Sequence, residues 1–432
     1  MTNPLLIDVG RLRVGMYIQL DLGWMNHPFP VSSFRIASPE QINTLAALGL
    51  SQVRWIPSKS DPSVQGLLPP GHPSAPDPVT EAARAPVETG PSIAQASMAE
   101  FRERIKAQSR SLAACDERFA RATRVYERLA TSAEQDPSEA RASTNALVST
   151  CVDELLDQGD SAIRLLSERV GTRAALHSVN VMVLSLLLGK ALGLLGDDLQ
   201  PLGAAALLHD LGKITLPPHV AQPHSALGPA DQALYEAHVG ESVVLAERMG
   251  LGAAVIEAIA HHHEMADGTG FPLQLKGADI SRGGQVLALV NYYDRLCNPL
   301  RGANALTPHE ALSVIFAQHK QRFDAVVLRA FIRMMGVYPP GSIVQLVDDR
   351  YAIVTAVNSA RPLRPKVIVH ESGVSKDDAL VIDLEDQPAL GIRRSLRPAQ
   401  LPRDALDYLS PRKRICYYFE RAVDAAPTGA PA

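Results

Sequence analysis

The run LGAAALLHDLGK, residues 202–213, is the most informative part of the chain. Its first residues are small and apolar, which is typical of a helix buried on all sides. The helical pattern reaches His209 and Asp210 and then breaks at Gly212 and Lys213. Burying a histidine beside an aspartate is costly unless hydrogen bonds or a metal ion satisfy them. The pair therefore predicts a metal-binding end to an otherwise apolar helix.

Histidines are concentrated around this run. Eight of the thirteen lie within residues 177–263, where the apolar spacing predicts continuous helix. Imidazole nitrogens with a bridging carboxylate suit two adjacent divalent transition metals. The adjacent His-Asp and His-His pairs favour ligands, whereas a single buried histidine such as His177 or His238 is more often a hydrogen-bonded core residue. His219 and His224 lie in a proline-containing loop and are expected at the surface.

The pattern before His262 and His263 predicts that both side chains point into the protein. Continuing the apolar stripe by three and four residues from Ile259 reaches these two histidines. His261 falls off this face and is left out of the predicted site. A zinc-protease helix would need a second histidine where Asp267 stands, so that motif is absent.

The remainder of the chain consists of small β-containing units around a helical centre. Short β-branched segments predict strands near both ends, and a capping signal at Ser38 predicts one small helix. Nine prolines between Pro57 and Pro91 predict a flexible linker. The predicted division is an N-terminal α+β domain at 1–60, a linker at 61–98, a helical segment at 99–168, a helical core at 169–336, and a C-terminal β unit with a tail helix at 337–421.

Composition excludes several classes of protein. The 432 residues are 46% hydrophobic and 20% charged, and their net charge of -4 would not coat a nucleic acid polymer or an anionic membrane. The four cysteines are far apart, so neither a disulfide framework nor a thiolate zinc site is predicted, and a reducing cytoplasm fits. The apolar run at 179–196 contains polar residues and predicts a core helix rather than a membrane span.

The order of these motifs resembles that of the HD-GYP family, bacterial phosphodiesterases of cyclic di-GMP. The matching segments are HSVN at 177–180, HDLGK at 209–213, HVG at 238–240, HHE at 262–264 and DGTGFP at 267–272. The first 60 residues are similar to a domain of unknown function often found before HD-GYP modules. The resemblance implies a mainly α protein, with an HD-type helical bundle between a small N-terminal α+β domain and a small C-terminal β unit.

The resemblance also implies two divalent metal ions, iron or manganese, and a set of site residues. The ligands carried over are His177, His209, Asp210, His238, His262 and His263, with Asn291 at the position of a further ligand. Asp210, as the bridging ligand, and Lys213, which would contact a phosphate oxygen, are assigned to catalysis. Substrate binding is assigned to Lys213, Asp267, Gly268, Gly270, Phe271, Pro272 and Arg301.

Several positions depart from the family pattern. Asn291 offers a neutral amide oxygen where the family carries a charged aspartate, which lowers metal affinity, and Asp294 one turn later is expected to compensate in part. Phe271 replaces the tyrosine of the family name, and Leu300 stands where an arginine often reaches the ligand. Arg173 replaces the glutamate of three-metal members, which indicates two metals.

Three functions stay open on the sequence. The leading hypothesis is hydrolysis of cyclic di-GMP to the linear dinucleotide and on to GMP, slowed by the departures at residues 271, 291 and 300. The alternative is a degenerate, non-catalytic module that binds nucleotide or protein partners as a regulator. The third is a broader HD-type hydrolase of another phosphoester. The resemblance also implies contacts with diguanylate cyclase-type proteins. The helices at 99–168 are expected to pack either as hairpins or as the seam of a homodimer.

Overall fold

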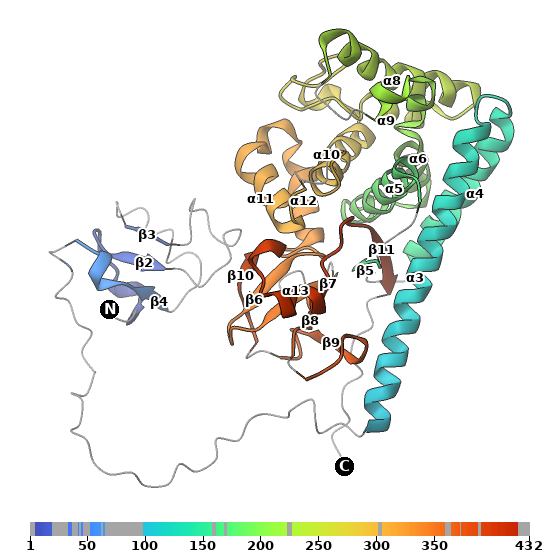
Figure 1. Cartoon of the computed structure of the whole chain (residues 1–432). Helices are drawn as coiled ribbons and strands as arrows, with labels where there is room; N and C mark the ends of the chain where they lie inside the picture. The colour runs from blue at the N-terminus through green and yellow to red at the C-terminus, as the bar shows by residue number, and fades with distance from the viewer. Residues whose placement is uncertain are drawn as a thin grey trace, which may run out of the picture. The chain divides into compact units, whose positions relative to one another are not determined.

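The computed structural model divides the chain into two units, residues 1–95 and 96–432, which are described separately (Figure 1). It describes residues 5–19, 33–36, 42, 45, 52–61, 64, 98–157, 161–167, 171–222, 227–300, 305–358, 364–371, 373–387 and 390–421.

The N-terminal unit is built on an antiparallel sheet in the order β1-β4-β2-β3. The strands are β1 (Leu5–Asp8), β2 (Tyr17–Gln19), β3 (Ser33–Arg35) and β4 (Gln52–Trp55). Ile18 and Trp55 are fully buried in its core, and the indole Nε1 of Trp55 donates a hydrogen bond of 2.9 Å to Ser60 Oγ. Most of the helix predicted to begin at Ser38 lies outside the described residues.

The second unit begins with a helical hairpin and continues into a bundle, followed by a sheet and one short helix (Figure 1). The hairpin is α3 (Met98–Ser132) and α4 (Pro137–Asp157). The bundle contains α5 (Arg173–Ala191), α6 (Gly196–Leu208), α7 (Pro218–Ala221), α8 (Pro229–Arg248), α9 (Ala253–Ala260), α10 (Arg282–Cys297), α11 (Pro308–Gln318) and α12 (Ala325–Met335), and α13 (Arg403–Leu409) follows within the sheet region.

Helix α5 forms the centre of the bundle because it packs against α6, α10, α12 and α3. Every residue from Ser178 to Gly189 is buried, which explains why the helix is apolar on all sides. Its length and composition would also suit a membrane span, but 78% of its apolar window is buried inside the protein. A buried core helix accounts for this pattern, as the sequence predicted. Close packing recurs at Gly203 of α6, where a Cβ would lie 2.6 Å from Val148 of α4.

The sheet of the second unit joins residues that are far apart in sequence. Its main path is β10-β6-β7-β5-β11, and β8 pairs with β7 and β9. The strands are β5 (Ser161–Leu165), β6 (Ile343–Leu346), β7 (Tyr351–Asn358), β8 (Lys366–Val369), β9 (Val381–Asp383), β10 (Ile392–Leu396) and β11 (Tyr417–Arg421). The prediction of helix throughout 99–168 is wrong at β5, which lies between β7 and β11. The C-terminal β unit therefore includes a strand from before the bundle.

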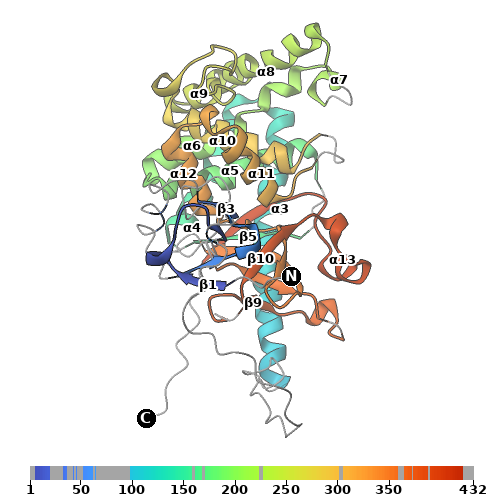
Figure 2. The same ribbon diagram turned by 90° about the vertical axis from the view of Figure 1, so that its left-hand side faces the viewer.

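One helix connects the bundle and the sheet. α3 packs against both α5 and β11, and Figures 1 and 2 show it extending alongside both layers. The prediction of a mainly α fold with small β-containing parts at both ends is confirmed. The five-part division of the chain stays a prediction.

Candidate metal centre

The end of α6 places Asp210 against α8. His209 caps the helix, and Asp210 precedes a short 3-10 helix at Leu211–Thr215. A Cβ on Gly212 would lie 2.4 Å from the backbone oxygen of His238, so only glycine permits this approach. The Gly212 N–H donates to Ser242 Oγ at 2.8 Å, which fixes the contact with α8. Asp210 is thereby held beside His238.

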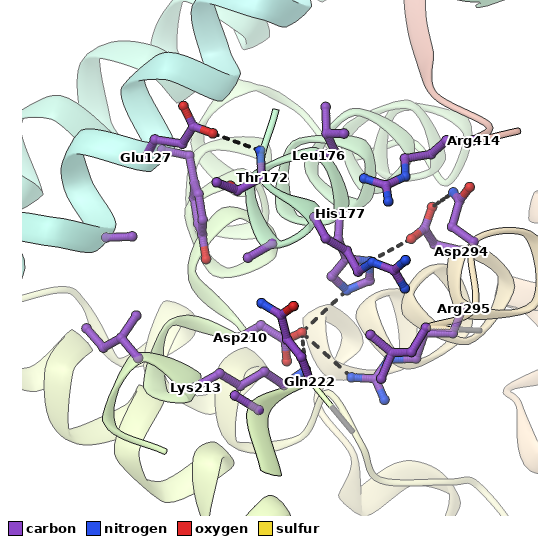
Figure 3. Close-up of a pocket in the computed structure, with 18 of the residues that line it drawn as sticks. Glu127, Thr172, Leu176, His177, Asp210, Lys213, Gln222, Asp294, Arg295 and Arg414 are labelled. Atoms are coloured by element: carbon purple, nitrogen blue, oxygen red, sulfur yellow. Dashed lines mark hydrogen bonds and ion pairs between the residues drawn. The ribbon is translucent and has the colours of Figure 1, made fainter. Parts of the chain in front are cut away.

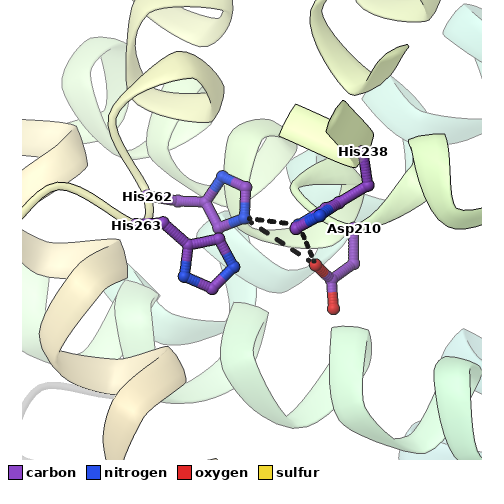
Figure 4. A group of neighbouring side chains, drawn as sticks. All are labelled: Asp210, His238, His262 and His263. Atoms are coloured by element: carbon purple, nitrogen blue, oxygen red, sulfur yellow. Dashed lines mark hydrogen bonds and ion pairs between the residues drawn. The ribbon is translucent and has the colours of Figure 1, made fainter. Parts of the chain in front are cut away.

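The histidines form two clusters that share Asp210. One contains Asp210, His238, His262 and His263, and the other contains His177, His209 and Asp210. Figure 4 shows the first cluster, with three rings turned toward the carboxylate. Within each cluster the possible ligand atoms lie within 4.8 Å of one another.

The two oxygens of Asp210 face different pairs of histidines. Oδ1 lies 3.2 Å from His238 Nε2 and 3.7 Å from His262 Nε2. Oδ2 lies 3.5 Å from the Nε2 atoms of both His177 and His209. A carboxylate placed in this way is suited to bridge two cations.

The opposite ring nitrogens fix the tautomer of these four histidines. Each Nδ1 faces an oxygen: Ala206 O at 2.8 Å for His209, Ile259 O at 2.6 Å for His262, Tyr235 O for His238, and Asp294 Oδ2 at 2.6 Å for His177. Because these oxygens only accept, the protons belong on Nδ1 and the Nε2 lone pairs point inward. This arrangement is typical of metal-ligating histidines.

Burial keeps most of the cluster neutral. It lowers the pKa of His238 to about 4 and holds the pKa of His209 and His263 well below the usual value. Burial also lowers the pKa of His177, but hydrogen bonds to Asp210 and Asp294 outweigh it and raise the pKa overall.

Among the buried side-chain atoms without a hydrogen-bond partner in the described residues, two belong to these clusters, Asp210 Oδ1 and His263 Nε2. Unpartnered buried acceptors are costly. A divalent cation would satisfy both, so the residues present fit a metal centre.

Asp294 acts through His177. Its Oδ2 accepts from His177, while its Oδ1 accepts from Asn180 Nδ2 at 2.6 Å and Asn298 Nδ2 at 2.8 Å. Both carboxylate oxygens are therefore engaged, and the expectation that Asp294 compensates in part for Asn291 stays a prediction. The carboxylate orients the His177 ring.

Asn291 is buried beside the cluster, but its amide oxygen is already engaged. Asn291 Oδ1 accepts from Arg295 Nε at 3.0 Å. Arg295 Nη2 also lies 3.6 Å from Asp210 Oδ2. The assignment of Asn291 as a metal ligand stays a prediction.

Lys213 lies in the short 3-10 helix rather than one turn along a continuing α-helix. Its Nζ is 2.5 Å from Asp210 Oδ2 and 5.1 Å from the centre of the Tyr235 ring. Arg295 approaches the same ring at 5.8 Å. Two cations are thus gathered at the Asp210 edge of the site, where they are suited to bind a phosphate.

The segment around His262 and His263 corrects the sequence argument. α9 ends at Ala260, so both histidines lie in the following turn rather than on the continuing helix. They are buried nevertheless, as expected. His261 caps the helix and its Nδ1 lies 3.2 Å from Ser281 Oγ, outside both clusters.

The segment 267–272 contacts His263 through Phe271. The Phe271 ring stacks on the His263 ring, with centroids 4.4 Å apart and an interplanar angle of 21°. A Cβ on Gly270 would lie 2.4 Å from Met265 N, while Gly268 has a positive φ of 81°. Asp267 Oδ1 accepts from Thr269, and Pro272 follows a cis peptide bond.

A cavity of about 720 Å³ opens on the His177 and Asp210 side of the centre (Figure 3). Its size is typical of a small-molecule site. Four basic side chains line it: Arg173, Lys213, Arg295 and Arg414. Residues 267–272 do not line this cavity, and their assignment to substrate binding stays a prediction. Leu300 does line it, and Arg301 lies outside the described residues.

Sequence reasoning missed three charged residues that line the cavity, Glu127, Arg295 and Arg414. Arg295 lies one helical turn after Asn291, and Arg414 ends the basic run PRKR at 411–414, so both left a signal. Glu127 gave no such signal, because the sequence of a long charged helix does not distinguish a carboxylate that faces a cavity from one that faces water.

Comparison with known proteins agrees with this geometry. Residues 125–327 match the family model described as HD domain, and residues 5–144 match Domain of unknown function (DUF3391). The chain is 28% identical over 386 residues to cyclic di-GMP phosphodiesterase PA4108 of Pseudomonas aeruginosa, covering 86% of each chain. It is 27% identical over 162 residues to 3'3'-cGAMP-specific phosphodiesterase 1 of Vibrio cholerae, covering 36% of this chain and 37% of that one.

A solved structure, "Bd1817, a HDG"Y"P protein from Bdellovibrio bacteriovorus", matches 76% of this chain and 98% of its own at 18% identity, with a TM-score of 0.38. In class, the fold and the site define a helical HD domain with a buried histidine and aspartate cluster. Residues 125–327 match the HD domain and residues 5–144 match DUF3391, which agrees with the resemblance seen in the sequence.

Proposed function

We propose that this protein is a metal-dependent phosphodiesterase that opens cyclic di-GMP to the linear dinucleotide and on to GMP, in the cytoplasm. The observation that carries the proposal is the position of Asp210, whose two oxygens face two separate pairs of inward-pointing histidine nitrogens. Relatives named as cyclic di-GMP phosphodiesterases support the choice of substrate.

The residues of the site divide the work between metal and substrate. His177, His209, Asp210, His238, His262 and His263 would hold two divalent ions, iron or manganese. Such ions stabilise charge on a phosphoryl oxygen and lower the pKa of water. Lys213 and Arg295 lie close enough to Asp210 to bind the phosphate whose bond is cleaved.

One observation favours the regulator alternative. Arg295 donates a hydrogen bond to Asn291 and also approaches Asp210. The guanidinium therefore brings a positive charge close to the ligand atoms, and this charge opposes the binding of a metal ion. A protein of this kind would bind the cyclic dinucleotide through its basic cavity and release no product.

The deciding experiment starts from protein purified without oxygen in the presence of iron or manganese. We expect two metal ions per chain and conversion of cyclic di-GMP to linear dinucleotide. Asp210→Asn should lose both, whereas Asp324→Asn, at the N-cap of α12, should lose neither. Tight binding of cyclic di-GMP without product would favour the regulator, and neither binding nor product would refute both functions.

A further inference from the structure

The cavity has a second polar end, away from the histidines. There α3 contributes Glu127, whose Oε1 accepts the backbone N–H of Thr172 at 2.9 Å (Figure 3). Thr172 caps α5, so Glu127 is fixed relative to the helix that carries His177. The metal-binding end and the Glu127 end belong to one continuous cavity.

Glu127 differs from the other acidic residues of the cavity wall. Asp210 and Asp294 both contact histidines. Glu127 forms no ion pair within the described part of the chain, although four basic side chains line the same cavity. Its carboxylate is half-buried and holds one backbone hydrogen bond. It therefore retains capacity to accept further hydrogen bonds.

The Glu127 carboxylate would repel a phosphate group of the ligand. Its partner is therefore expected to be an uncharged hydrogen-bond donor elsewhere in the ligand. Guanine presents such donors side by side, the N1–H and the N2 amino group, whereas adenine presents an acceptor at N1. Charge-assisted pairs of this kind are stronger than neutral ones. The opposite edge of guanine carries the O6 and N7 acceptors, which pair with arginine.

Two arginines, Arg173 and Arg414, line the same cavity as Glu127, and Figure 3 shows Arg414 across Leu176 from it. Arg173 directly follows Thr172 in sequence, and its pKa is lowered by burial and by the nearby charge of Arg414. Arg173 Nη1 donates to Pro299 O at 3.1 Å, which fixes its guanidinium against the cavity wall. One cavity therefore offers a base an acceptor, two donors and the apolar surface of Leu176 and Pro299.

We propose that Glu127 recognises a guanine base of the cyclic dinucleotide and so selects it against adenine. The inference rests on the proposed function, since it places the phosphodiester at the Asp210 end. Glu127 is then a specificity-determining residue, and Arg173 and Arg414 bind the same base from its other edge.

A purely structural role for Glu127 is distinguishable. If Glu127 served only to hold Thr172, then Glu127→Gln would preserve that role, because the amide oxygen still accepts the Thr172 N–H. The amide NH2 would then face the N1–H and N2 donors of guanine, so no hydrogen bond could form between them. The N1 acceptor of adenine could instead accept a hydrogen bond from the amide.

The experiment measures binding of cyclic di-GMP, 3'3'-cGAMP and cyclic di-AMP by calorimetry, together with product formation. We expect the wild type to prefer cyclic di-GMP, and Glu127→Gln to lower the cyclic di-GMP to cyclic di-AMP affinity ratio by roughly 10-fold to 100-fold, the range for a pair of base contacts. Glu117→Gln is the matched control on the exposed face of α3 and should leave the ratio unchanged.

The outcomes separate this inference from the proposed function. An unchanged ratio in Glu127→Gln, or a wild type that binds all three ligands equally, overturns the role of Glu127 even if hydrolysis is observed. Guanine-selective binding that Glu127→Gln abolishes supports the role even if no product forms, in which case hydrolysis alone fails. A wild type that binds no cyclic dinucleotide overturns both.

Discussion

The contact between Asp294 and His177 gives the sharpest test of the metal centre. In Asp294→Asn, one carboxylate oxygen becomes an NH2 group. Asn180 and Asn298 both donate to the Oδ1 side, so the remaining oxygen must stay there and the new NH2 must face His177. The His177 Nδ1 would then accept a hydrogen bond, its proton would move to Nε2, and the lone pair directed at the metal would be lost.

The size of the effect follows from this change of tautomer. Replacing a group that orients a metal-binding histidine lowers metal affinity by roughly 10-fold to 100-fold, equal to about 1.4–2.7 kcal/mol. Only the cluster of His177, His209 and Asp210 should be affected. The other cluster does not contact Asp294, and the Nδ1 atoms of His238 and His262 face the backbone oxygens of Tyr235 and Ile259. One of two metal ions should therefore weaken selectively.

Metal titration of metal-free protein, followed by calorimetry and by metal counting after dialysis, measures this effect. The wild type should retain two ions where Asp294→Asn retains one. Asp324→Asn, whose carboxylate caps α12 through Val326 and Val327, serves as the control and should behave like the wild type. Two ions held at wild-type affinity in Asp294→Asn would refute the tautomer argument.

Three further predictions test other parts of the site. Asn291→Asp should raise metal affinity about tenfold, or about 1.4 kcal/mol, because a charged oxygen replaces an amide oxygen; an unchanged value on titration would mean that Arg295 keeps this oxygen from the metals. Arg414→Gln should weaken cyclic di-GMP binding roughly tenfold, as expected for a lost charged hydrogen bond, and loss of metal instead would contradict its assignment to substrate. Burial lowers the pKa of His238 to about 4, so the unfolded chain takes up a proton near pH 6.5 that the folded chain does not. Stability of the metal-free protein is therefore full above about pH 6.5 and falls toward pH 4, by up to about 3 kcal/mol from His238 alone. Denaturant unfolding at about pH 7 and about pH 5 measures this loss, and equal midpoints would contradict it.

The class of the protein and much of its centre could be predicted from the sequence. An apolar run that ends in His209-Asp210 has few structural solutions, because a buried polar pair needs partners. The same reasoning identified the inward position of His262 and His263, although the helix that was expected to carry them ends earlier. These inferences depend on local periodicity and on the cost of burying polar groups, and both can be read along the chain.

The orientation of the centre and the position of its cavity depend on long-range contacts that the sequence does not reveal. Asp294 orients His177 across 117 residues of sequence, and Glu127 meets Thr172 across 45. β5 lies between β7 and β11, and Asn180 accepts the Tyr417 N–H, so the end of the chain helps to position the first helix of the bundle. Such contacts leave no periodic signal, because each depends on where two distant segments pack. A single charged side chain on a long helix gives the same pattern whether it faces water or a ligand.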